Sequence, residues 1–168
     1  MKKQNGFSLI ELLIVVAIIL IIAAIAIPNL MRSKMAANES SAVSALRTIN
    51  TAEVTYSTVY PGVVYSNDLP SLGGTPAVCS VPAGATSATA CIIDNILATA
   101  TTLGTAKSGY FYTYTLGAVV GGINTSYTAT ATPTVLGTAG QRYFFTDQSG
   151  VLRYALSGPA TLASSALQ

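Results

Sequence analysis

The longest apolar run of the chain lies near its N-terminus and predicts its first element. From Phe7 to Ile27 the sequence has no Gly or Pro and a single charged residue, Glu11. At a rise of about 1.5 Å per residue, a helix of this length spans about 30 Å, the hydrocarbon thickness of a bilayer. In lipid, an isolated spanning segment must be helical to satisfy its backbone. The pattern therefore predicts a transmembrane helix over residues 7–27.

Behind this run, apolar residues recur at steps of three and four, which predicts that the helix continues as an amphipathic one to about Ser57. One stripe should face a globular head; it consists of Met31, Met35, Ala42, Ala45, Leu46, Ile49, Ala52 and Tyr56. Tyr60-Pro61-Gly62 ends the helix. Pro28 lacks an amide donor and crowds the preceding turn, so we expect a kink or break near residues 24–28.

The remainder, residues 58–168, is expected to form the globular head. Residues 58–108 carry turn chemistry and a short helix within 92–102 started by Asp94. From Tyr110 the period becomes two, which predicts strands at 110–115, 126–132, 141–146 and 151–155, with the sheet confined to about 109–156. The residues from Ser157 onward are expected to form a loose tail or an edge segment. The predicted fold class is α+β, with an antiparallel sheet against the long helix.

Glu11 is the unusual residue of the apolar run. A carboxylate within a membrane span costs about 2.5–3.5 kcal/mol, so it needs a partner. If the chain were cut between Gly6 and Phe7, a new α-amino group would lie four residues before Glu11, one helical turn away. Amine and carboxylate could then pair within one chain or between two copies, which would fix the axial register of neighbours.

Two other interpretations of this segment remain open. Lys2 and Lys3 before an apolar run could belong to an ordinary secretory signal peptide, with Ala24-Ile25-Ala26 as its cleavage site. Alternatively, Ser8-x-x-Glu11 could be a helix-capping box and nothing more. The capping box explains neither Gly6 nor the lysines.

The stretch Lys2-Lys3-Gln4-Asn5-Gly6-Phe7-Ser8-Leu9-Ile10-Glu11-Leu12 resembles the class III signal of type IV prepilins and pseudopilins. Pro28 also matches the family's pattern, whereas the rest of the chain matches it only in layout. The resemblance implies a leader of residues 1–6, cleavage after Gly6 and N-methylation of Phe7 by a prepilin peptidase. It further implies insertion into the inner membrane and assembly, by machinery there, into a helical filament.

Charge and cysteine content agree with an exported polymer subunit. Of eight basic side chains two lie in the leader, which leaves 8 − 2 = 6 against six acidic ones, so neighbouring subunits would repel little. A basic patch for nucleic acid is absent from the sequence. Cys79 and Cys91 are expected to form a disulfide in an oxidising compartment. Two unpaired cysteines are the alternative; a metal site is less favoured in a chain without His.

The sequence offers no catalytic or cofactor-binding motif. Without His there is no His-based triad, and neither paired carboxylates nor a phosphate-binding Gly loop is present. Asp147 with Ser149 is the only candidate for a calcium site, and no metal site is expected. Asn124-Thr125-Ser126 and the Thr-rich stretch 125–138 could be glycosylated, although an exposed strand and loop is the preferred interpretation.

These observations predict a structural protein rather than an enzyme. The preferred function is the major subunit of a type IV pilus, first an inner-membrane precursor and then part of an extracellular filament. A major pseudopilin of type II secretion shares the same N-terminus and is the nearest alternative. An alternative of another class is a membrane-anchored periplasmic binding domain that never polymerises.

Overall fold

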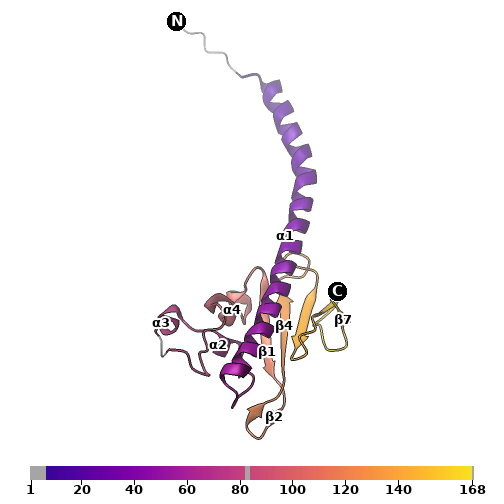
Figure 1. Cartoon of the computed structure of the whole chain (residues 1–168). Helices are drawn as coiled ribbons and strands as arrows, with labels where there is room; N and C mark the ends of the chain where they lie inside the picture. Colours follow the sequence, from indigo (N-terminus) through magenta and orange to yellow (C-terminus); the bar gives the residue numbers. More distant parts are fainter. Residues whose placement is uncertain (1–6, 82–83, 168) are drawn as a thin grey trace. The chain divides into compact units, whose positions relative to one another are not determined.

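The computed structural model describes residues 7–81 and 84–167. The chain divides into two compact units, Met1–Lys34 and Met35–Gln168. Helix α1 (Leu9–Val59) supplies residues to both (Figure 1). Because the second unit also contains an antiparallel sheet, the predicted α+β class is confirmed.

Helix α1 has 51 residues and confirms the predicted long helix. It begins two residues after Phe7 and extends two residues past the expected end at Ser57. The leader residues lie outside the part of the chain that the structure describes. Pro28 lies inside the helix, which continues through it without interruption, so the expected break is not seen. A kink at Pro28 stays a prediction.

The second unit is built around a five-stranded antiparallel sheet in the order β1-β4-β5-β6-β7. Its strands are β1 (Tyr110–Leu116), β4 (Tyr127–Pro133), β5 (Tyr143–Asp147), β6 (Arg153–Ala155) and β7 (Ser165–Ala166). The four predicted strands are thus confirmed with shifted ends. The segment after Ser157 contributes β7, the edge strand that was one of its two expected forms.

The pairing of β1 with β4 shows how residue size shapes the sheet. Along β4 the buried positions alternate with partly exposed ones, as the period of two predicts. Tyr112 of β1 lies opposite Ala131 and Tyr114 opposite Ala129. Placing a small side chain opposite each large one leaves room for the tyrosine rings on the face that covers the core.

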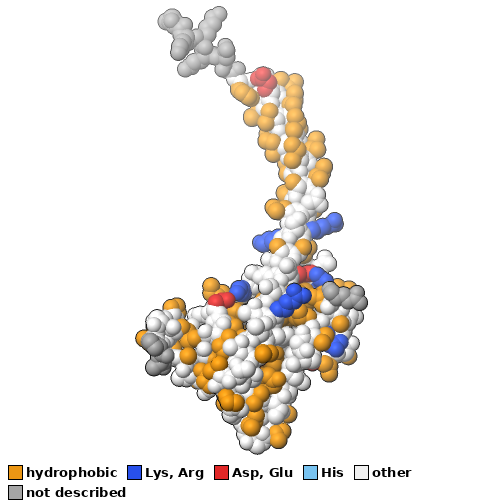
Figure 2. Space-filling view, in the orientation of Figure 1, with side chains coloured by type: hydrophobic (Ala, Val, Ile, Leu, Met, Phe, Trp, Pro, Cys, Tyr) orange, Lys and Arg blue, Asp and Glu red, His pale blue; other side chains and the backbone are white. Residues whose placement is uncertain are grey.

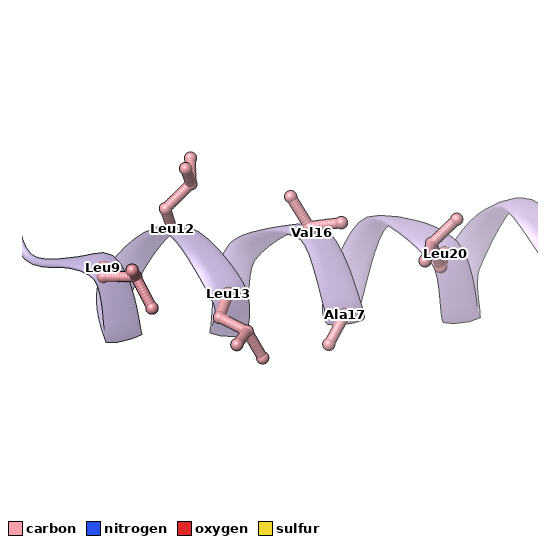
Figure 3. A pocket seen from close by; sticks show the side chains of 6 residues that line it. All are labelled: Leu9, Leu12, Leu13, Val16, Ala17 and Leu20. Atoms are coloured by element: carbon pink, nitrogen blue, oxygen red, sulfur yellow. The ribbon is translucent and has the colours of Figure 1, made fainter.

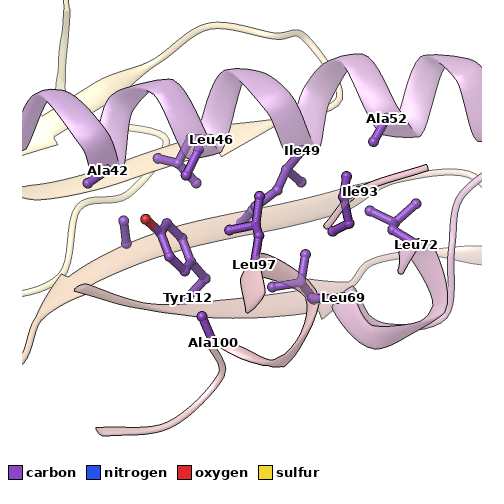
Figure 4. Packing of buried hydrophobic residues seen from close by; sticks show 14 of the residues in the cluster. Ala42, Leu46, Ile49, Ala52, Leu69, Leu72, Ile93, Leu97, Ala100 and Tyr112 are labelled. Atoms are coloured by element: carbon purple, nitrogen blue, oxygen red, sulfur yellow. The ribbon is translucent and has the colours of Figure 1, made fainter. Parts of the chain in front are cut away.

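The core lies between this sheet and the α1 residues of the second unit (Figure 4). Six of the eight expected stripe residues are buried, from Ala42 to Tyr56. Met31 and Met35 are the exceptions. Met35, the first residue of the second unit, is only partly buried, and Met31, which belongs to the first unit, is 46% exposed.

Short elements connect the helix to the sheet. They are α2 (Leu69–Leu72), α3 (Pro76–Cys79), α4 (Asn95–Thr99) and the 3₁₀ helix η1 (Leu103–Thr105). The carboxylate of Asp94 accepts the Leu97 amide at 2.8 Å, which confirms that it starts the short helix predicted there. A separate hairpin, β2 (Val119–Val120) and β3 (Ile123–Asn124), turns at Gly121-Gly122, where both residues have positive φ.

Candidate functional site

The apolar half of α1 exposes its side chains on all sides. Every residue from Leu9 to Ile22 is exposed, as is Phe7 before it. By length and composition this helix could cross a membrane. A helical segment that is apolar all round and exposed among the described residues needs an apolar environment, which a bilayer or neighbouring helices would supply.

One face of this segment forms a shallow apolar hollow of about 380 Å³. Its lining follows helical steps of three and four: Leu9, Leu12, Leu13, Val16, Ala17 and Leu20 (Figure 3). The small side chain of Ala17 lowers the surface between its larger neighbours. This arrangement of ridge and gap suits the side chains of another helix.

Glu11 lies near the start of the helix, is exposed, and at 100° per residue projects from the side opposite this hollow. Its Oε2 atom accepts a hydrogen bond from the Ser8 amide at 3.0 Å. The Leu12 amide donates to the Ser8 carbonyl at 3.3 Å, so Ser8 stands at the N-cap position. The carboxylate therefore forms one half of the capping box that its spacing predicts. One backbone amide does not neutralise a carboxylate, so capping leaves the need for a cation.

The other residues expected at the site have different outcomes. Gly6 lies outside the described residues, and Phe7, 78% exposed, contacts no partner that would test its role. The cleavage, methylation and assembly roles stay predictions. Cys79 and Cys91 form a disulfide, which confirms that expectation.

Comparison with known proteins supports the interpretation of the N-terminus. Residues 1–27 match the family described as the prokaryotic N-terminal methylation motif. The chain is 46% identical over 54 residues to the type IV major pilin protein PilA of Myxococcus xanthus, covering 32% of this chain and 24% of the relative. It is 38% identical over 64 residues to type II secretion system core protein G of Vibrio cholerae, covering 36% and 44%.

The N-terminal segment is similar to those of type IV pilins and of a type II secretion core protein. A further relative is the type IV wide pilus major component PilA4 of Thermus thermophilus, 55% identical over 40 residues, which are 24% of this chain and 30% of the relative. The matches thus span less than half the length of these curated relatives. No solved structure matches the chain significantly.

Two buried acids of α1, Glu39 and Glu53, were not predicted from the sequence. Glu39 is buried and forms an ion pair with Arg142, with 2.7 Å between Oε2 and Nη2. Its Oε1 atom accepts the amides of Gln141 at 2.8 Å and Arg142 at 3.2 Å. The pair fastens α1 to the segment that leads into β5.

Glu53, the second buried acid, has no cation beside it in the described residues. Its two oxygens accept the Ser66 hydroxyl at 2.5 Å and the Ser66 amide at 3.1 Å. Removal from water raises the pKa of the Glu53 carboxyl, and the two hydrogen bonds offset only part of that rise. The helical period could have revealed it, because Glu53 lies four residues after buried Ile49.

The side chains proposed for a calcium site and for a glycan both form hydrogen bonds within the head. Asp147 is buried, and its Oδ1 accepts the Ser149 amide and hydroxyl. Within the described residues, no three His, Cys, Asp or Glu side chains gather as metal ligands. Asn124 is 4% exposed and donates to the Tyr65 carbonyl at 2.6 Å. The expected exposed strand and loop is found at Ile123 and Thr125, whereas Asn124 itself is buried with its side-chain amide engaged.

Proposed function

We propose that this chain is the major subunit of a type IV pilus. It would be inserted by its apolar helix, cut between Gly6 and Phe7 by a prepilin peptidase, and assembled by inner-membrane machinery into an extracellular helical filament. The names of the relatives, which are pilus and secretion-system components, support a structural rather than an enzymatic role.

One observation carries this proposal: the segment Leu9–Ile22 of α1 is exposed at every residue, and Glu11 is its single charged side chain. Between Phe7 and Met31 the sequence has no charge other than Glu11. In an apolar surrounding that charge requires a cation. The amine created at Phe7 would lie one turn away, or beside the Glu11 of a neighbouring copy. Pairing between copies would set the axial step of the filament, while faces such as the Leu9–Leu20 hollow pack in its interior.

The Ser8 hydrogen bond gives a way to separate charge pairing from helix capping. Glu11→Gln keeps an oxygen for the Ser8 amide and removes the charge, whereas Glu11→Ala removes both. If pairing with an amine sets the register, both variants should lose sheared surface filaments to a similar degree, at least about tenfold for a loss of about 1.4 kcal/mol.

Electron microscopy and immunoblotting of sheared material provide the measurement, with total chain in the cells as the control for expression. Normal filaments from Glu11→Gln alongside a defect in Glu11→Ala would reduce Glu11 to a cap. Mass spectrometry of the same material tests processing, because Gly6→Leu should leave the leader attached. A chain that stays with the membrane after shearing in all forms would instead support an anchored, non-polymerising domain.

The second candidate is a major pseudopilin of type II secretion. The match to core protein G spans 64 residues, longer than the 54 matched in PilA of Myxococcus xanthus. Against it, the engaged carboxylate of Asp147 and the disulfide favour the pilus. Deletion of the gene decides between them: loss of surface filaments supports the pilus, and accumulation of secreted proteins inside the cell supports the pseudopilin.

A further inference from the structure

Two basic residues lie directly after the apolar segment of α1, and the proposed filament assembly assigns no role to either of them. Arg32 and Lys34 are the first charges after Glu11, and both are exposed on α1 (Figure 2). At 100° per residue, two positions apart are 200° around the helix, so their side chains leave on opposite sides.

Neither cation has an acidic partner among the described residues. The preceding acid, Glu11, lies 21 residues away, about 31 Å along a helix. The following acid, Glu39, has both oxygens engaged by Arg142 and the Gln141 amide. Two unpaired cations beside an apolar span call for an anionic surrounding.

The distance along the helix places these cations at a definite depth. From Leu9 to Arg32 is 23 residues, about 35 Å, against a hydrocarbon layer of about 30 Å. If the Phe7 end lies at one face of the layer, Arg32 and Lys34 lie just beyond the other, among the headgroups. Their long stems can reach the phosphates while keeping apolar contact.

The orientation of the helix makes the position of these two cations unusual. With the leader on the cytoplasmic side, Arg32 and Lys34 lie on the opposite side, against the usual bias of basic residues towards the cytoplasm. After a cut behind Gly6 they would be the only basic side chains flanking the span.

We propose that Arg32 and Lys34 bind the phosphates of anionic lipids in the leaflet on the head side, one on each side of the helix. This rests on the membrane-inserted precursor of the proposed function. The two contacts hold the subunit at a fixed depth, with Glu11 near the opposite face. A subunit that leaves the membrane for a filament loses both lipid contacts. The contacts therefore oppose release of the subunit from the membrane before assembly.

The test reconstitutes the full chain in nanodiscs of equal phosphatidylglycerol and phosphatidylcholine and counts retained lipids by native mass spectrometry. Each cation near an anionic surface should favour the anionic lipid about fivefold. Arg32→Gln/Lys34→Gln should therefore lower the phosphatidylglycerol preference at least fivefold. Lys2→Gln/Lys3→Gln measures the share of the opposite end, and Arg47→Gln, an exposed cation of the second unit, is the matched control and should change nothing.

Equal retention of phosphatidylglycerol by the full chain and by Arg32→Gln/Lys34→Gln overturns the proposal, as does an equal loss with Arg47→Gln. Displacement of the lipid by inorganic phosphate would also overturn it, because the site would then take free anions rather than headgroups. A chain that does not enter nanodiscs at all contradicts the membrane precursor itself. Failure of the Glu11 variants to affect filaments leaves the lipid count untouched, so the two proposals fail separately.

Discussion

At the residue scale, the acids of the second unit serve its structure. Glu39 pairs with Arg142 and Glu53 holds Ser66. Asp68 and Asp94 cap α2 and α4. Because the remaining acid there, Asp147, closes a turn, few carboxylates are left free in a head that carries so few charges. A weakly charged surface lets copies of a subunit approach closely.

Glu53 should make stability depend on pH. Burial raises its pKa above the unfolded value of 4.5, so the folded chain binds the proton more tightly and stability falls as pH rises from 4.5 through the folded pKa. Gln carries no charge at any pH. Over that range the free energy of unfolding of Glu53→Gln should therefore increase relative to that of the parent chain, by about 1.4 kcal/mol for each unit by which folding raises the Glu53 pKa. Denaturant unfolding at pH 5 and pH 8 measures this; an equal difference at both values would contradict it.

Tyr112 and Tyr110 form a matched pair on β1, both fully buried. The Tyr110 hydroxyl donates to the Arg142 carbonyl at 2.8 Å, whereas that of Tyr112 has no hydrogen-bond partner within residues 7–81 and 84–167. Tyr110→Phe should cost about 1 kcal/mol, and Tyr112→Phe should be neutral or stabilising by a similar amount. Unfolding can be followed by tyrosine fluorescence, since the chain lacks Trp. Equal losses in both would show that Tyr112 has a partner.

At the element scale, the disulfide closes a loop whose first part is not packed against the core. Helix α3, which ends at Cys79, buries none of its residues. The second half of the loop is tied to the rest of the head: the Tyr56 hydroxyl donates to the Ser87 carbonyl at 2.7 Å, and the Ala90 amide donates to the Ser71 carbonyl at 2.7 Å. A Cβ on Gly74 would meet the Cys79 sulfur at 2.6 Å and the Cys91 sulfur at 2.8 Å, so the backbone approaches the bridge closely.

Replacing both cysteines by serine should therefore loosen the loop before the sheet. For a loop closed across a sequence separation of 12, the chain-entropy relation gives a loss of about 3 kcal/mol. Limited proteolysis should cut between residues 79 and 91 while the remaining fragments stay associated and strand-rich by circular dichroism. Cutting within β4 at the same rate would mean that the bridge supports the whole head.

At the scale of the whole molecule, the described residues of the first unit are almost all exposed, whereas the second unit has a core of its own. All members of the core cluster, from Ala42 onward, belong to the second unit. A chain beginning at Met35 should therefore fold without detergent and keep the melting temperature of the full chain within about 4 °C, the shift expected for about 1 kcal/mol. Aggregation or a lower melting temperature would show that the first unit supports the head.

The sequence pattern was sufficient to predict an element wherever a single hydrophobic period ran through the whole segment. The apolar run, the stripe from Ala42 to Tyr56 and the alternation in β1 and β4 each follow from side-chain spacing. Strand ends were less certain because they depend on pairing: β5 begins at Tyr143 rather than 141, and β6 at Arg153 rather than Val151, where partners become available. The β2–β3 hairpin was missed because two-residue strands have no readable period.

The sequence by itself determined the long helix, the lone acid at Glu11 and the cysteine pair, because these depend on composition and spacing along the chain. Only the tertiary structure decided that Glu39 and Glu53 lie inside, that the side chain of Asn124 is buried, and that the Tyr112 hydroxyl has no partner among the residues that the structure describes. Those outcomes arise from contacts between residues far apart in sequence. Arg142, for example, lies 103 positions after Glu39, to which it donates a hydrogen bond. A helical period shows which face is covered, but not which chemical group covers it.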